Sequence, residues 1–195
     1  MIDKFRIDEA QKNINSYLAD ELIKKEKFEK VVYDTYYNNS KESIKVSDIL
    51  LQNNISNLWV VVTSYYSMFY IANALLYNLG YKIGNKIAHK ITLEALIVYV
   101  RNKLHKSLLE NFEETKDNAM NLIKNQSDEI IESFDYERLK RSKFQYESTE
   151  EIKSSKANTS FNRAKIFFNE INKIIDSIQK WYKYTILEMN SLNLI

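Results

Sequence analysis

The sequence predicts an all-α protein, an antiparallel helical bundle of about five to six helices, and three observations support this fold class. The 195 residues contain no proline and only two glycines, so little in the chain interrupts a long helix. Apolar residues recur three and four positions apart along most of the chain, as they do on one face of a helix. No run of strictly alternating apolar and polar residues lies between hairpin turn residues, so no β-strand is expected.

The core helix is expected at 58–79, directly before Gly80. At 100° per residue it shows three faces. The broad apolar face consists of Leu58, Val61, Tyr65, Met68, Phe69, Ala72, Leu75, Leu76 and Leu79. The second face, of mostly small residues that let a neighbouring backbone come close, consists of Ser64, Ser67, Ile71, Ala74 and Asn78. The third face is aromatic with hydrogen-bonding groups and consists of Tyr66, Tyr70, Asn73 and Tyr77. A helix with something to bury or pair on every side is expected at the centre of its domain.

One domain is the default at this length, with residues 1–57 as an N-terminal helical extension and 58–182 as the bundle core. The first helix is expected to begin at the cap Asp8, and its continuation through Phe28 and Val32 is left open. Its apolar residues are Ala10, Ile14, Tyr17, Leu18 and Leu22. The polar cluster at 36–43 is either a loop or a helical bend. A shorter apolar pattern follows it and consists of Ile44, Ile49, Leu50, Leu51 and Ile55.

The core helix has a signal at each end. Ser56 and Asn57 offer an N-terminal cap, and Gly80 permits a left-handed C-terminal cap. The next helix is expected to start near Ile91 or Thr92. Whether 91–124 forms one helix or two stays open.

Two further helices are expected in the C-terminal half of the chain. Ser127 and Asp128 predict the N-terminal cap of the first, and the second begins near Ser154 or Ser155. The apolar stripe of this last helix consists of Ala157, Phe161, Ala164, Phe168, Ile171, Ile175, Ile178 and Tyr182.

Composition narrows the function classes. Lys and Arg number 28 against 26 Asp and Glu, and a net charge of +2 does not by itself require a polyanionic partner. The absence of cysteine excludes disulfides, thiolate nucleophiles and most zinc sites, and two histidines are too few for a His-rich metal centre, so no cofactor is expected. The N-terminus has no apolar core like that of a signal peptide. Polar residues interrupt the apolar sequence of the core helix, so it is not expected to span a membrane. A cytoplasmic protein with no membrane contact is expected.

Two stretches of the chain together resemble the HEPN family, in particular its small bacterial and archaeal members. Residues 64–84, SYYSMFYIANALLYNLGYKIG, followed by His89, are similar to the family's YYxMF helix, glycine turn and following histidine. Residues 141–146, RSKFQY, are similar to the Arg-x-x-x-x-Tyr form of the family's motif. A last helix with Ala164 and Phe167 or Phe168 completes the pattern, which covers 58–178.

The resemblance implies a helical bundle that forms a homodimer, with the motif arginines of two subunits facing a shared cleft. Many members are metal-independent endoribonucleases, often toxins paired with a small nucleotidyltransferase antitoxin. RNA or a nucleotide as ligand and a nucleotidyltransferase as partner are therefore implied. In those members a histidine follows the arginine after four to six residues, whereas this chain has no histidine after His105.

The candidate catalytic residues are Arg141 and Tyr146. Metal-free RNA cleavage needs a proton acceptor for the 2′-hydroxyl and a cation for the charge on the phosphorane. Arg141 can hold a phosphate through a bidentate contact, but a tyrosine with its ordinary pKa of about 10 is a poor base. Two alternatives stay open, an altered ribonuclease and a binding module that kept the bundle and lost the chemistry. A purely structural Arg141–Tyr146 pair is also open.

The remaining candidates flank this motif or lie on the core helix. Candidate RNA- or phosphate-binding residues are Arg138, Lys140 and Lys143, which otherwise form an ordinary solvated basic face. Candidate supporting residues are Tyr66, Tyr70, Asn73 and His89. The tyrosines suit base stacking, and their alternative role is in the core or a dimer interface. His89 is expected to be a hydrogen-bonded structural residue rather than a base.

Overall fold

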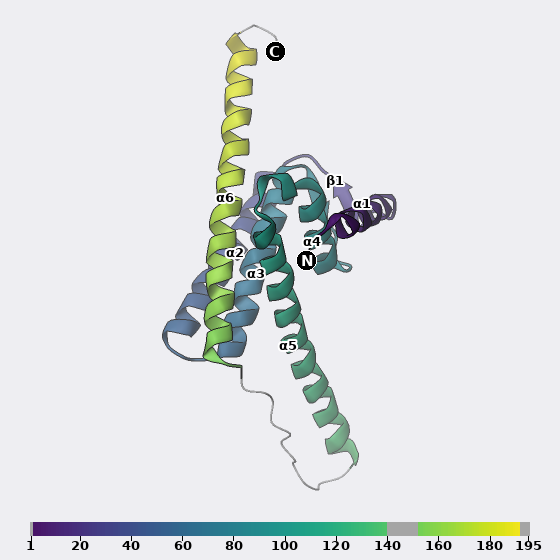
Figure 1. Cartoon of the computed structure of the whole chain (residues 1–195), viewed down its shortest axis with the longest axis vertical. Helices are drawn as coiled ribbons and strands as arrows, with labels where there is room; N and C mark the ends of the chain where they lie inside the picture. The colour runs from purple at the N-terminus through teal and green to yellow at the C-terminus, as the bar shows by residue number, and fades with distance from the viewer. Residues whose placement is uncertain (1, 140–151, 192–195) are drawn as a thin grey trace.

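The computed structural model describes residues 2–139 and 152–191, and within them the side chains of residues 2–124, 152–181 and 184. Six α-helices and one two-stranded sheet form the described part of the chain (Figure 1). Their order is α1 (Lys4–Ala19), β1 (Ile23–Lys25), α2 (Lys30–Gln52), α3 (Asn57–Asn78), β2 (Tyr81–Ile83), α4 (Ala88–Tyr99), the 3₁₀ turn η1 (Arg101–Lys103), α5 (Lys106–Leu139) and α6 (Ser154–Ser191). The prediction of an all-α helical bundle is confirmed, apart from the short sheet.

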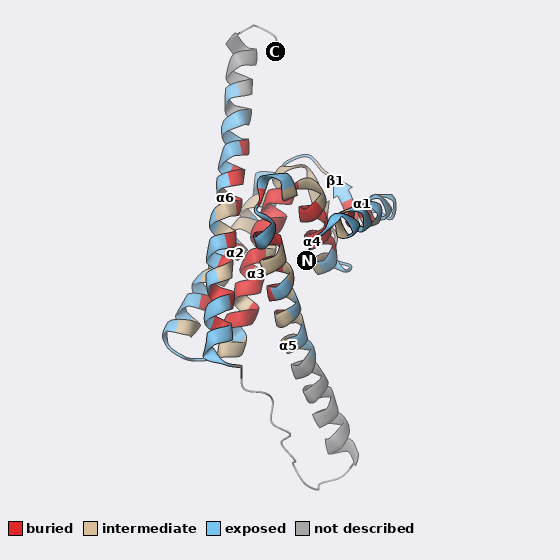
Figure 2. Ribbon diagram, viewed as in Figure 1, coloured by how far each residue is buried: buried red, intermediate tan, exposed pale blue. Residues whose placement is uncertain are grey.

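Helix α3 lies at the centre of the bundle. It packs against α2, α6, α5 and α4, and buried residues cover most of its length (Figure 2). Its N-terminal cap is Ser56, whose side chain accepts a hydrogen bond from the Trp59 N–H, and Gly80 follows the helix with a φ of +88°. Both predicted end signals are therefore confirmed. A φ in this region favours glycine, which has no Cβ to clash with its own backbone.

The apolar character of α3 also fits a membrane span by length and composition alone. It is the one helix among the described residues that meets this test, and 67 % of its most apolar window is buried inside the protein. Burial of this extent by neighbouring helices is typical of the core helix of a soluble domain.

The N-terminal segment differs from its prediction in two ways. Helix α1 begins earlier than predicted, after the cap Asp3 rather than Asp8. It ends at Ala19, so the continuation through Phe28 and Val32 that the sequence left open does not occur. The chain reverses at Glu21, which has a φ of +56°, and β1 then pairs antiparallel with β2, with Ile23 opposite Ile83. The partner strand lies far along the chain, so the local pattern could not reveal it.

The polar cluster at 36–43 lies inside α2, so it is helical and not a loop. Ser40 in this cluster and Ser47 one helical turn beyond it are both buried against α3. Ser40 Oγ donates to the Ser67 carbonyl at 2.7 Å, and Ser47 Oγ lies 2.7 Å from Ser64 Oγ. All four serines are fully buried between α2 and α3. The small-residue face of α3 therefore admits a neighbouring helix closely, as predicted.

The segment at 91–124 contains parts of two helices, α4 and α5, separated by η1. Helix α4 starts at Ala88, earlier than predicted, directly after Ile87 with a φ of +46°. The predicted cap at Ser127 and Asp128 is wrong, because α5 continues through both residues to Leu139. Neither glycine nor proline interrupts this stretch, so a serine and an aspartate alone do not end the helix.

Helix α6 begins at Ser154, as predicted, and packs along α3 and α2. Its predicted stripe is largely buried, but Phe167 rather than Phe168 points into the core. Phe168 is half-buried, and its ring centroid lies 6.1 Å from that of Tyr37 on α2. The C-terminal end of α6 extends beyond the other helices (Figure 1).

Helix α1 is attached to α4 through a buried carboxylate. Glu94 is completely buried and accepts hydrogen bonds from Arg6 Nη1 and Asn13 Nδ2, each at 3.1 Å. Tyr17 lies beside it, and burial, followed by the neighbouring Glu94, raises the pKa of Tyr17 to about 12. A buried charge needs such partners, so these contacts hold α1 in place.

Candidate functional site

The aromatic face of α3 has an open half and a closed half. Tyr66 and Tyr70 are half-buried, whereas Asn73 and Tyr77 are buried. The chain between β1 and α2 contacts Tyr77, and α4 contacts Asn73 through Thr92. Only the open half can meet a ligand.

The two residues of the closed half hold the fold together. Tyr77 Oη accepts a hydrogen bond from the Glu29 N–H and donates one to the Lys27 carbonyl, both at 3.1 Å. Asn73 Nδ2 donates to Thr92 Oγ1 at 3.2 Å and thereby joins α3 to α4. Their polar groups are satisfied by the protein itself, which is the usual state of buried polar groups.

His89 joins the open half from the first turn of α4. Its Nδ1 lies 2.7 Å from Tyr65 Oη on α3. The imidazole centroid is 4.5 Å from the Phe69 ring and 5.9 Å from the Tyr66 ring. Residues from both ends of the first HEPN-like stretch therefore form one aromatic cluster, which we call the Tyr65–His89 cluster (Tyr65, Tyr66, Phe69 and His89).

The protonation state of the cluster follows from its burial. Burial, and next the positive charge of Lys116 on α5, lowers the pKa of His89, so the imidazole is neutral at pH 7. Burial raises the pKa of Tyr65 far above its ordinary value, so the phenol keeps its proton. Nδ1 of His89 is the one hydrogen-bond partner of this hydroxyl in the described part of the chain.

The tautomer of His89 can be assigned from these facts. If Nδ1 carried the proton, the buried Tyr65 O–H would have no acceptor, which costs about 1–3 kcal/mol. Tyr65 therefore donates to Nδ1, and the ring proton of His89 lies on Nε2. In this state Nε2–H is a hydrogen-bond donor and cannot accept a proton.

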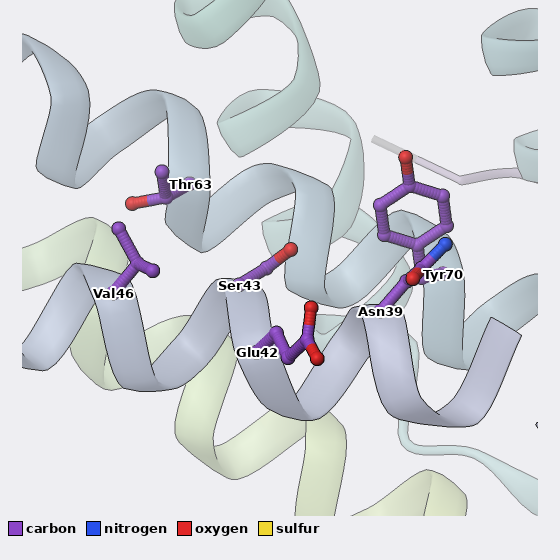
Figure 3. A pocket seen from close by; sticks show the side chains of 6 residues that line it. All are labelled: Asn39, Glu42, Ser43, Val46, Thr63 and Tyr70. Carbon is purple, nitrogen blue, oxygen red and sulfur yellow. The ribbon is translucent and has the colours of Figure 1, made fainter. Parts of the chain in front are cut away.

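A shallow groove between α2 and α3 lies next to the open half. It has a volume of about 320 Å³ and is lined by Asn39, Glu42, Ser43, Val46, Thr63 and Tyr70. Figure 3 shows the α2 side chains on one wall and Thr63 and Tyr70 on the other. The Tyr66 and Tyr70 rings are adjacent, with centroids 5.9 Å apart. The groove thus combines an aromatic surface with several hydrogen-bonding groups.

A cation lies near the covered end of the same face. Lys82 on β2 pairs with Glu26 at 3.0 Å, and both side chains are partly exposed. Burial raises the pKa of Tyr36 on α2, and the nearby Lys82 charge opposes this rise. Lys82 is therefore close to the tyrosines of α2 and α3.

The second HEPN-like stretch, 141–146, lies outside the described residues. Arg141, Tyr146, Lys140 and Lys143 lie outside the described residues, and Arg138 belongs to α5 but its side chain is not described. The structure therefore brings together Tyr66 and His89 from the predicted set, with Tyr70 beside them. It does not place the basic candidates.

Some residues of the site were not singled out in the sequence. Tyr65 was assigned only to the apolar face, although a tyrosine fully buried in such a face requires a partner for its hydroxyl. The α2 wall of the groove comes from the polar cluster at 36–43, whose helical spacing of Asn39, Glu42 and Ser43 was the available signal. No group of three or more carboxylate or imidazole side chains that could hold a metal ion occurs among the described residues.

No protein-family model matches the chain, and no match was found among curated proteins.

Proposed function

We propose that this chain is a HEPN-type, RNA-directed protein that acts in the cytoplasm as a two-fold homodimer. The observation that carries the proposal is the Tyr65–His89 cluster. Tyr65 and His89 are 24 residues apart and hydrogen-bonded to each other, and both belong to the stretch that resembles the family. Their contact supports the proposal because it joins the helix and the following histidine of that stretch in one cluster.

In this proposal the basic stretch supplies the contacts to RNA. Arg141 holds a phosphate, with Arg138, Lys140 and Lys143 adding positive charge around it. The half-exposed rings of Tyr66 and Tyr70 provide surfaces on which bases stack. If the chain cleaves RNA, Arg141 stabilises the phosphorane and Tyr146 takes part in proton transfer, without a metal ion.

A second candidate function is a binding module without catalysis, and two observations favour it. No histidine follows His105 in the sequence. His89 carries its proton on Nε2 and has a lowered pKa, so it offers no proton acceptor for a 2′-hydroxyl. In this form the chain retains RNA or a nucleotide, or serves as the partner of a small nucleotidyltransferase.

The test compares the wild type with Arg141→Ala in an RNA cleavage assay without divalent cations. Arg101→Ala serves as the matched control, because it removes an arginine from η1 rather than from the basic stretch. If the chain is a ribonuclease, wild type and control cleave, and Arg141→Ala loses about 10²-fold or more of the activity. Equal cleavage by all three would remove Arg141 from the mechanism.

Retention of RNA without cleavage would identify the binding module. Such retention should weaken steeply between about 50 mM and 200 mM salt, because phosphate contacts release counterions. If the wild type neither cleaves RNA nor retains it, the RNA-directed proposal is overturned. Sedimentation at micromolar concentration should give two chains per particle, and a monomer would refute the homodimer.

A further inference from the structure

The groove between α2 and α3 combines one aromatic ring with several hydrogen-bonding side chains. It is open rather than enclosed and has a volume of about 320 Å³, so a molecule bound there would lie partly in solvent. One wall carries the Tyr70 ring, and Asn39, Glu42 and Ser43 lie on the other (Figure 3). An aromatic ring beside an open groove suits a planar ligand, because ring faces stack.

The opposite wall carries a defined set of hydrogen-bonding groups. Asn39, Glu42 and Ser43 are three and four residues apart on α2, so their side chains share one face of the helix. An ionised carboxylate only accepts hydrogen bonds, whereas the amide and the hydroxyl can both donate and accept. Glu42 is exposed, and its carboxylate can accept N–H or O–H donors from a molecule in the groove.

We propose that this groove binds a guanine base, with the base stacked on Tyr70 and read by Glu42. The inference rests on the proposed RNA-directed function and names the base that the protein prefers. Guanine carries two adjacent N–H donors, N1–H and N2–H, that match the two oxygens of a carboxylate. The pairing edges of adenine, cytosine and uracil place an acceptor beside each donor, so they cannot satisfy both oxygens.

The other groups of the groove complete the recognition. The Asn39 amide can donate to the guanine O6, which is adjacent to N1–H on the same edge of the base. The negative charge of Glu42 repels phosphate, so the base enters the groove while the sugar–phosphate backbone stays outside. Thr63 and Val46 line the remaining part of the groove.

The experiment is calorimetric titration of the full chain with GMP, AMP, CMP and UMP. GMP should bind about tenfold more tightly than the other three, as expected for one bidentate base contact. Glu42→Gln should remove most of this preference. Tyr70→Ala should weaken all four nucleotides by about tenfold, whereas Tyr70→Phe, which keeps the ring, should not.

The matched control is Asp48→Asn, which removes one negative charge from an exposed position of α2 outside the groove. It should leave the binding of all four nucleotides unchanged. Glu42 is exposed, so Glu42→Gln is expected to keep the fold, and thermal melting followed by circular dichroism checks each variant.

The outcomes separate this inference from the function on which it rests. Equal affinity for the four nucleotides, or GMP binding that neither Glu42→Gln nor Tyr70→Ala changes, would overturn the guanine site. RNA retention without any preference for guanine would also overturn it, while leaving the RNA-directed function in place. Guanine-selective binding that depends on Glu42, in a chain that retains no RNA, would support the site and overturn the proposed function.

Discussion

Helix α3 carries two polar faces, and neighbouring helices bury one of them but leave part of the other exposed. The serine face (Ser64 and Ser67) is completely buried, and each of its hydroxyls contacts a serine of α2. The open half of the aromatic face (Tyr66 and Tyr70) is only partly covered and borders a groove. Both faces carry hydroxyl groups, so the type of functional group does not determine which face is buried and which is open.

The comparison shows that polar residues on a core helix serve two different purposes. On the serine face, small side chains let α2 approach, and the hydrogen bonds satisfy groups that would be costly to bury alone. On the open half, the large rings of Tyr66 and Tyr70 are only partly covered, and Tyr70 lines a groove with hydrogen-bonding side chains of α2. The first face should therefore respond to substitution through stability, and the second through binding.

The largest effect is expected from filling the serine face. Ser64→Leu inserts a larger side chain where α2 and α3 are in contact and removes the hydrogen bond to Ser47, which should lower the free energy of unfolding by about 2–3 kcal/mol. Thr63→Leu, one residue earlier and half-exposed, should change it by less than about 0.5 kcal/mol. Urea unfolding measures both, and equal losses would contradict the distinction between the faces.

The next effect separates the closed and open halves of the aromatic face. Tyr77→Phe leaves the Glu29 N–H and the Lys27 carbonyl without their partner and should cost about 1–2 kcal/mol of unfolding free energy. Tyr70→Phe should cost less than about 0.5 kcal/mol, because Tyr70 is only half-buried and lines the open groove. Chemical denaturation measures both variants. If Tyr70→Phe lowered the free energy of unfolding more than Tyr77→Phe, the assignment of Tyr77 to the closed half and Tyr70 to the open half would be wrong.

A smaller effect tests the hydrogen bonds of the serine face without changing its packing. Ser47→Ala removes the contacts of Ser47 Oγ with the Val60 carbonyl and Ser64 Oγ and should lower stability by about 1 kcal/mol. The control Ser43→Ala, one helical turn away on the groove wall, should have almost no effect. Thermal melting of the two variants provides the comparison, and a neutral Ser47→Ala would show that close packing alone holds the helices together.

The smallest effect is a pH dependence at the border of the open half. The pKa of His89 is lower in the folded chain than its ordinary value of about 6.5, so the unfolded chain binds more protons between the two values. The free energy of unfolding should therefore fall as the pH decreases from about 6.5 through the folded pKa of His89, and then level off.

The variant His89→Gln should lose this pH-dependent decrease in the free energy of unfolding. His105→Gln, at an exposed position, should keep it. Urea unfolding at several pH values between about 7.5 and 5 gives the difference between each variant and the wild type. An unchanged pH slope in His89→Gln would show that the imidazole is not held in its neutral form.

The parts of the fold that could be predicted are those that depend on neighbouring residues in the chain. The Ser56 cap, the glycine after α3 and the start of α6 at Ser154 are local signals, and the structure contains all three. The reversal at Glu21 that leads into β1 could not be predicted, because the partner strand is remote in the sequence. The cap at Ser127 was wrong because a capping residue type is also tolerated inside a helix.

For the candidate site, the sequence by itself determined which residue types are present and their helical spacing. It placed Tyr66, Tyr70, Asn73 and Tyr77 on one face of α3, and a period of 3.6 residues is enough for that. Only the tertiary structure decided that Tyr77 is closed and Tyr70 open, that Tyr65 donates a hydrogen bond to Nδ1 of His89, and that Asn39 and Glu42 line a groove together with Tyr70. These properties depend on which other segment covers each side chain, and burial and pairing between distant segments are not local properties of the chain.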